Sequence, residues 1–260
     1  MIVAEMLRGK GIITHEDLAN YKPVERKVIK GKYKDYEIIT MGPPSSGGIC
    51  VIYMLNILEN YNLKSIGRAS IDYINLLAET MKRVYADRSE YMGDLDFYKV
   101  PVDVLISKSY AKTRFEDFKF GEVISSDKIK PGNISKESPQ TTHLSVADSK
   151  GNMVSLTTTL NDTYGNKVVV DGAGFLLNNE MDDFSVKPGV PNIFGLIGNE
   201  ANAIEPGKRM LSSMTPTLIL KDSKPYMVVG SPGGGKIITS VLQTILNVIE
   251  FEMDIQEAVD

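Results

Sequence analysis

The chain has 260 residues, enough for one large or two small domains. Its composition, 42% hydrophobic and 24% charged, is ordinary for a globular protein, and its net charge of −4 argues against nucleic-acid binding, which needs a concentrated basic face. One cysteine and two histidines exclude an internal disulfide and argue against a zinc site or a Ser-His-Asp triad, so we expect chemistry without imidazole, metal or cofactor.

The chain up to about residue 118 is predicted to be mostly helical. A short amphipathic helix ends at Gly9, and a variant capping box over residues 14–17 opens a second helix. Residues 36–41 are predicted to form a strand, and a Gly-Pro-Ser loop over 42–48 leads into an apolar helix that contains Cys50 as a core residue. A longer helix is predicted from apolar residues at helical spacing, namely Ile71, Ile74, Leu77, Ala78, Met81, Val84 and Tyr85.

The chain changes character after a polar segment over residues 119–140, which is typical of a linker. Beyond it, two hairpins and a helix are predicted, with the strands at 142–148, 153–160, 217–220 and 226–229 and the helix at 237–249. Helices, then strands, then a helix indicate an α+β fold with sheet packed between helical layers. We divide the chain into a mostly helical part, 1–140, and a β-rich then helical part, 141–260.

The segment at the start of the first hairpin, residues 138–146 (Ser-Pro-Gln-Thr-Thr-His-Leu-Ser-Val), contains a candidate nucleophile. If the Gln140–Thr141 bond is cut, Thr141 gains a free α-amine beside its own hydroxyl, so that one residue carries both nucleophile and base. An α-amine has a pKa of roughly 7.7–8.0 and accepts a proton readily near neutral pH. The same residues are also typical of an ordinary strand start after a proline turn.

A glycine-rich loop over residues 230–236 follows a predicted strand and opens a helix. It matches G-x-x-x-x-G-K of phosphate loops, but Ile237 stands where the magnesium-binding Ser or Thr belongs, and Pro232 removes a backbone donor. A better use for Gly233 and Gly234 is as backbone donors to an oxyanion, because glycine lets a substrate approach closely. Nucleotide binding remains the alternative hypothesis.

Two polar segments complete a candidate site for a zwitterion. Residues 178–184 are rich in carboxylates and amides, which suits a substrate ammonium but also a solvated turn, while the EF-hand spacing for calcium is absent. Residues 209–216 hold paired hydroxyls beside Arg209, which suits a carboxylate or an ordinary loop. In this hypothesis Glu180 and Asp183 hold an amine, Ser212 and Ser213 a carboxylate, and Gly233 and Gly234 the reacting carbonyl.

Taken together, these motifs resemble the γ-glutamyltranspeptidase family of N-terminal nucleophile hydrolases. The matching segments occur in family order at residues 43–48, 85–91, 141–143, 177–184, 211–214 and 230–234. The resemblance implies a four-layer αββα sandwich, made as one precursor and cut into two subunits that stay together. It covers only the middle part of such a precursor, so the fold is expected to be incomplete at both ends.

The resemblance also implies roles for individual residues. Thr141 would attack the carbonyl of Gln140 to cleave the chain and would then attack γ-glutamyl amides such as glutathione, with water, an amino acid or a peptide as acceptor. Thr159 matches the hydroxyl that bonds the nucleophile, and Gly233 and Gly234 match the oxyanion hole. The substrate-binding positions are matched by Asn161, Glu180 and Asp183 at the amine and by Ser212 and Ser213 at the carboxylate.

Two departures from the family pattern lead to an alternative hypothesis about function. The family arginine that clamps the substrate carboxylate falls outside this chain, with Arg209 as a possible stand-in, and Phe194 replaces the tyrosine of the family lid. The alternative is therefore an inactive member, or a subunit that needs a partner chain.

No stretch approaches the ~20 apolar residues of a membrane span, and residues 1–7 lack the features of a signal peptide. The family is usually periplasmic or extracellular.

Overall fold

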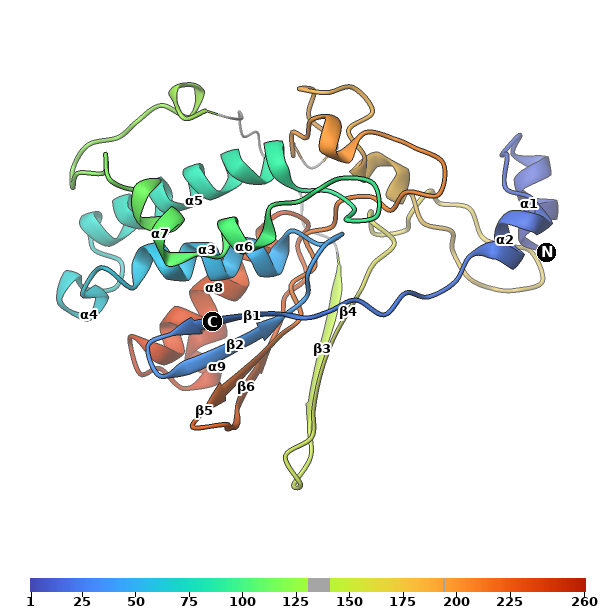
Figure 1. Cartoon of the computed structure of the whole chain (residues 1–260). Coiled ribbons are helices and arrows are strands. Elements are labelled where there is room, and N and C mark those ends of the chain that lie inside the picture. Colours follow the sequence, from blue (N-terminus) through green and yellow to red (C-terminus); the bar gives the residue numbers. More distant parts are fainter. Residues whose placement is uncertain (131–140, 194) are drawn as a thin grey trace.

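The computed structural model describes residues 1–130, 141–193 and 195–260 (Figure 1). Its main helices gather on one side of a four-stranded antiparallel sheet, and a separate two-stranded hairpin leans against the last two strands of that sheet. The predicted α+β class is confirmed. The four layers of the expected sandwich are not all defined by these elements, so the complete sandwich stays a prediction.

The four-stranded sheet takes strands from both parts of the chain. Its order is β1-β2-β5-β6, and the two component hairpins join along β2 and β5, where Ile38 lies opposite Ile219. The sequence predicted β2, β5 and β6 but missed β1, whose Lys-Gly-Lys centre obscures the alternation of a strand. The bounds are β1 (Ile29–Tyr33), β2 (Tyr36–Thr40), β5 (Thr217–Lys221) and β6 (Lys224–Val229).

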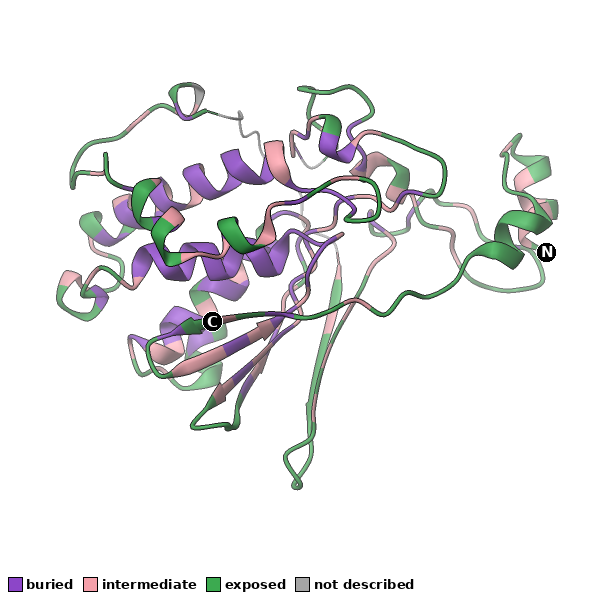
Figure 2. Ribbon diagram, viewed as in Figure 1, coloured by how far each residue is buried: buried purple, intermediate pink, exposed green. Residues whose placement is uncertain are grey.

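Helix α3 (Gly47–Leu58) forms the centre of the core, and all of its 12 residues are buried (Figure 2). It contacts β1, α5 (Ile71–Tyr91), α7 (Lys108–Thr113) and α8 (Lys236–Ile249), so that neighbours cover its whole circumference. Cys50 is buried here, as predicted, and burial raises the pKa of its thiol to about 12. A cysteine in this setting is a packing residue.

Helix α5 differs from its prediction at both ends. Ile71 and Ile74 were placed on its apolar side, but they are 84% and 58% exposed, because the first turn extends beyond the core. Its last turns are polar in sequence and yet buried, with Asp87 1% and Arg88 3% exposed. The end of the helix therefore carries polar side chains into the interior.

The β3–β4 hairpin consists of β3 (Thr142–Ala147) and β4 (Met153–Thr158), close to its predicted bounds. One face carries cross-strand apolar pairs, Leu144 with Leu156 and Val146 with Val154, and these side chains are between 49% and 55% exposed. The hairpin is held to the large sheet through the hydroxyl of Ser155, which donates to the carbonyl of Val229 at 3.2 Å.

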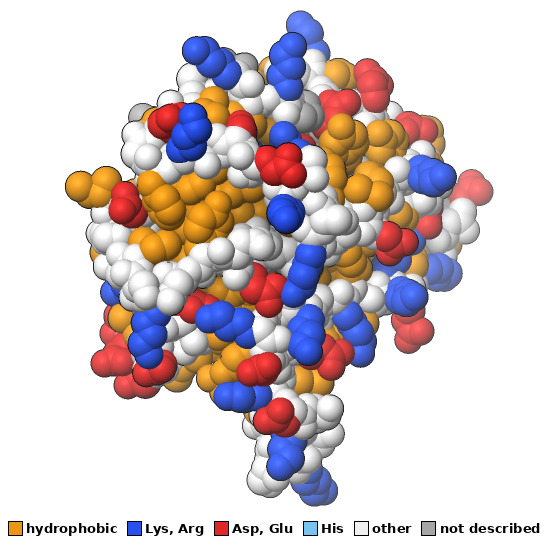
Figure 3. Space-filling view, turned by 60° about the vertical axis from the view of Figure 1, so that its left-hand side comes forward, with side chains coloured by type: hydrophobic (Ala, Val, Ile, Leu, Met, Phe, Trp, Pro, Cys, Tyr) orange, Lys and Arg blue, Asp and Glu red, His pale blue; other side chains and the backbone are white. Residues whose placement is uncertain are grey.

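The remaining elements are short and lie around this core. As predicted, Gly9 follows the first helix, and Thr14 with Asp17 forms a capping box. Figure 3 shows acidic and basic side chains interspersed over one face of the molecule. No helix in the described part of the chain is long and apolar enough to cross a membrane. The bounds are α1 (Ile2–Arg8), α2 (His15–Asn20), α4 (Leu63–Ile66), α6 (Val102–Leu105), η1 (Ser126–Lys128), η2 (Glu180–Asp183), η3 (Glu200–Asn202) and α9 (Ile255–Val259).

Candidate active site

A narrow cavity brings together residues from widely separated parts of the sequence. It measures about 20 Å3, little more than one water molecule needs. Its walls come from the base of the β3–β4 hairpin, from η2, from the loop before β5 and from the loop before α8. The residues proposed from sequence that line it are Thr141, Thr159, Asn161, Asp183, Ser212, Ser213 and Gly234.

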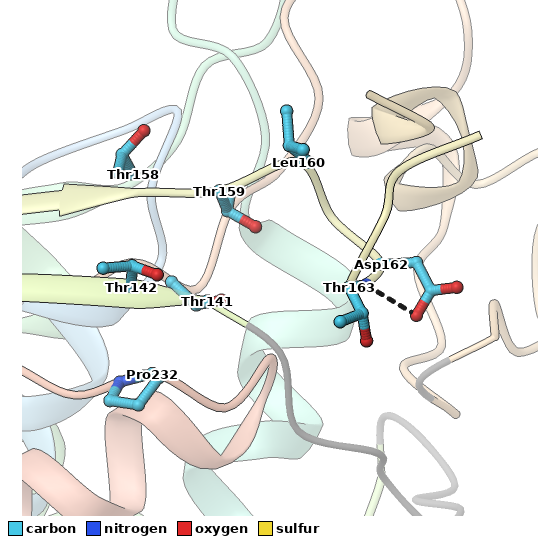
Figure 4. A pocket seen from close by; sticks show the side chains of 8 residues that line it. All are labelled: Thr141, Thr142, Thr158, Thr159, Leu160, Asp162, Thr163 and Pro232. Carbon is cyan, nitrogen blue, oxygen red and sulfur yellow. Dashed lines mark hydrogen bonds between the residues drawn. The ribbon is translucent and has the colours of Figure 1, made fainter. Parts of the chain in front are cut away.

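A wider cleft of about 590 Å3 shares Thr141 and Thr159 with the narrow cavity (Figure 4). Cross-strand pairing of Thr142 with Thr158 places these two threonines at the same end of the hairpin. The Thr159 hydroxyl accepts a hydrogen bond from the backbone N–H of Asn161 at 2.8 Å. The cleft has the size of a small-molecule site and gives Thr141 access to solvent.

The acidic side of the cavity lies on η2. Burial, together with the negative charge of Glu180, raises the pKa of Asp183 to about 7, while the positive charge of Arg88 opposes the shift. Burial also raises the pKa of Glu180 to about 7. The backbone carbonyl of Asp183 accepts from the side-chain amide of Asn202 at 2.7 Å, which fixes the turn. Both carboxylates are partly buried and neither forms an ion pair within the described part of the chain, which suits a substrate cation.

The serine side of the cavity is held by the Pro-Pro-Ser-Ser loop that precedes α3. The backbone N–H of Ser46 donates to the carbonyl of Ser212, and the N–H of Ser212 donates to the carbonyl of Pro44, both at 2.9 Å. The hydroxyl of Ser212 accepts from the backbone N–H of Met214 at 3.1 Å. These bonds fix Ser212 without using the proton of its hydroxyl group.

Arg88 is a site residue that the sequence interpretation did not assign. Its guanidinium donates to the hydroxyls of Ser46 at 2.8 Å and Ser213 at 3.0 Å. The signal available in the sequence was its place in the matching segment 85–91, but its orientation depends on the packing of α5. Arg209, in contrast, points away from the cavity, since its guanidinium donates to the hydroxyl of Tyr21 and the carbonyl of Lys22. It therefore cannot stand in for the family arginine in this structure.

The glycine loop borders the cavity at the start of α8. Gly233 and Gly234 have φ of 131° and 55°, which residues with a side chain rarely adopt. Their backbone N–H groups donate to no backbone carbonyl among the described residues, which suits donors that await an oxyanion. The Tyr85 hydroxyl donates to the carbonyl of Gly235 and so anchors the loop to α5.

Some of the proposed site residues lie apart from the narrow cavity. Glu180 and Gly233 do not line it. Glu180 belongs to the same turn as the lining residue Asp183, and Gly233 precedes the lining residue Gly234. Gln140 and Phe194 lie outside the described residues, so the cleavage site and the lid position stay predictions. Within the described ranges no three His, Cys, Asp or Glu residues are grouped closely enough to hold a metal ion.

Comparison with known proteins now identifies the class. The model of the γ-glutamyltranspeptidase family matches residues 1–260. The chain is 51% identical over 258 residues to the glutathione hydrolase proenzyme of Escherichia coli strain K12, and 41% identical over 258 residues to the acylase ACY 1 proenzyme of a Pseudomonas species, strain SE83. The protein therefore belongs to the γ-glutamyltranspeptidase family.

A solved structure supports the same assignment at the level of the fold. The cephalosporin acylase of Bacillus halodurans superimposes with a TM-score of 0.78 at 26% identity, covering 97% of this chain and 43% of that one. The chain likewise spans 44% of the Escherichia coli protein and 43% of the Pseudomonas acylase. It thus corresponds to less than half the length of these relatives.

Proposed function

We propose that this protein is a self-processing γ-glutamyl hydrolase or transferase in which Thr141 is the nucleophile. The observation that carries the proposal is the single cavity in which Thr141 and Thr159 meet an acidic wall, a serine wall and a glycine loop.

The first reaction is cleavage of the chain before Thr141. The hydroxyl oxygen of Thr141 adds to the carbonyl carbon of Gln140, the C–N bond between the two residues breaks, and an ester forms. Breaking the C–N bond frees the α-amine of Thr141, and water then hydrolyses the ester to give the carboxylate of Gln140 and the regenerated Thr141 hydroxyl. This amine serves as the base in the second reaction. The products correspond to residues 1–140 and 141–260, a large-subunit part and a small-subunit part, and the shared sheet would keep them together as a heterodimer.

The second reaction transfers a γ-glutamyl group. Asp183, with Glu180 and Asn161 nearby, would bind the substrate ammonium, and Ser212 and Ser213 its carboxylate. The Thr141 hydroxyl attacks the γ-carbonyl, its α-amine passes the proton to the leaving amine, and Gly233 and Gly234 stabilise the oxyanion. Water or an amine acceptor resolves the ester. Glutathione is the proposed donor because the Escherichia coli relative is named a glutathione hydrolase.

The test is intact-mass analysis after incubation near neutral pH, with N-terminal sequencing of any fragments. We expect two pieces, the second beginning Thr-Thr-His-Leu, and a single uncut chain for Thr141→Ala. Release of p-nitroaniline from γ-glutamyl-p-nitroanilide should accompany cleavage. Normal cutting in the Thr141→Ala variant would refute the proposal.

A second candidate is a non-catalytic subunit that associates with a partner chain. The exposed apolar pairs of the β3–β4 hairpin favour it, because soluble proteins rarely leave such a face uncovered. This candidate predicts an intact chain without release of p-nitroaniline, together with self-association or capture of a partner in sedimentation experiments.

A further inference from the structure

Arg88 is a buried cation whose partners in the described chain are neutral. Its side chain extends from the last turns of α5 and the residue is 3% exposed. Other arginines that contact this helix are neutralised directly: Arg83 pairs with Glu79 and Arg114 with Asp87, at 2.8 and 2.9 Å. No described carboxylate forms such an ion pair with Arg88, and its guanidinium donates instead to two serine hydroxyls. Asp183 lies close enough for the charge of Arg88 to oppose the rise of its pKa, but the two form no ion pair. A buried charge without a directly bonded counter-ion is costly, which indicates a role that requires the charge.

The hydrogen bonds of Arg88 determine where the serine protons point. A guanidinium only donates, so each hydroxyl that it contacts must accept and must direct its own proton elsewhere. Ser46 donates its proton to the carbonyl of Ser212 at 2.8 Å. No described acceptor takes the hydroxyl proton of Ser213, a residue that lines the narrow cavity. Arg88 therefore leaves Ser213 ready to donate to an acceptor that enters the cavity.

Arg88 also lies next to both polar walls of the site. It lines a second small cavity of about 10 Å3 together with Asp183, so its positive charge lies between the acidic wall and the serine wall. A carboxylate that accepts from Ser213 would lie about 5 Å from the guanidinium, the sum of two hydrogen-bond lengths at a bent hydroxyl. At that distance the charge of a buried guanidinium still attracts an anion.

We propose that Arg88 is the positioning residue that selects substrates with a carboxylate next to the ammonium group. It does so by orienting the Ser213 hydroxyl as a donor and by supplying the positive charge behind it. This inference rests on the proposed function and extends it, since it names the group that confers preference for γ-glutamyl over simpler ω-amino acyl groups.

The experiment compares two anilides that differ only in the carboxylate. γ-Glutamyl-p-nitroanilide carries the ammonium and the carboxylate, whereas 4-aminobutyryl-p-nitroanilide carries the ammonium alone. For Arg88→Gln we expect KM for the γ-glutamyl anilide to rise about 10- to 100-fold, the range for losing a charge-assisted hydrogen bond, while kcat/KM for 4-aminobutyryl anilide changes less than about twofold. Arg209→Gln, the matched arginine outside the cavity, should leave both substrates unchanged.

The outcomes distinguish this inference from the proposed function. If the unsubstituted protein hydrolyses neither anilide, the proposed function fails and the inference fails with it. If it hydrolyses the γ-glutamyl anilide but Arg88→Gln loses the same factor on both substrates, the role of Arg88 is structural and only the inference is overturned.

Two further variants keep the test decisive if Arg88→Gln does not fold. Ser213→Ala removes the hydroxyl and keeps the guanidinium, so it should show the same selective rise in KM. Arg88→Lys keeps a donor and a charge and should recover part of the affinity for the γ-glutamyl anilide. Equal losses on both anilides in these variants would overturn the inference.

Discussion

The proposed nucleophile and the groups that face it belong to regions with very different packing. Thr141 lies at the base of a hairpin whose outer side chains, such as Leu156, are about half exposed. Arg88 and Tyr85, which anchor the serine and glycine walls, lie on α5 and are 3% and 6% exposed. The site therefore forms where a fixed helical support meets a sparsely held hairpin. We infer from this difference that the position of Thr141 relative to the serine and glycine walls depends more on the contacts between hairpin and sheet than on the core.

The largest expected effect contrasts the two regions directly. Leu55→Ala in α3 removes a fully buried side chain and should lower the free energy of unfolding by about 2–5 kcal/mol. Leu156→Ala on the exposed hairpin face should cost less than about 1 kcal/mol. Urea unfolding of both variants provides the measurement. Equal losses would show that the hairpin is packed as firmly as the core and would break the comparison.

The second prediction concerns the acidic wall. Asp183→Asn keeps the shape of the side chain but removes its charge, so kcat/KM for γ-glutamyl-p-nitroanilide should fall by roughly 10- to 100-fold, the cost of a charged hydrogen bond. Asp182→Asn is the matched control, because Asp182 belongs to the same turn but does not line the cavity. A loss in Asp182→Asn as large as in Asp183→Asn would contradict the assignment.

The third prediction tests the contact between hairpin and sheet. A Cβ at Gly230 would lie 2.1 Å from the ring of His143, which also contacts the hydroxyls of Thr157 and Ser145. Gly230→Ala should therefore displace the hairpin, cost about 1–3 kcal/mol of stability and lower kcat more strongly than it raises KM. His143→Ala in the Gly230→Ala background removes the clash and should restore part of the activity. If it does not, displacement of the hairpin is not the cause of the loss of activity.

The smallest expected effect is a pH dependence of stability. Because burial raises the pKa of Asp183 and Glu180 to about 7, the folded chain binds more protons than the unfolded chain between about pH 4 and 7. Their contribution to stability is present below pH 4 and is lost as the pH rises through 7. We expect Tm to fall from pH 5 to pH 8 on this account, and Asp183→Asn to reduce that fall. An unchanged slope in Asp183→Asn would show that the carboxylate is already ionised at pH 5.

Sequence patterns predicted the helices and strands that can be recognised from the spacing of their own residues. The strands β2, β5 and β6, the β3–β4 hairpin and helix α8 follow from period-two or helical spacing, and the capping box at Thr14 follows from adjacent residues. Strand β1 was missed because it has little alternation of its own and is stabilised by pairing with β2. Similarly, Ile71 and Ile74 follow the helical pattern but extend beyond the core.

By itself, the sequence determined which chemical groups are available: a threonine at a proposed cleavage site, carboxylates, hydroxyls and flexible glycines in a fixed order. The tertiary structure alone decided which of them meet. It turned Arg209 toward Tyr21 and Arg88 toward Ser213, although both are arginines next to matching segments. The physical reason is that side-chain direction depends on how α5 and the loop before β5 pack, and such contacts join residues more than 100 positions apart, with 125 between Arg88 and Ser213.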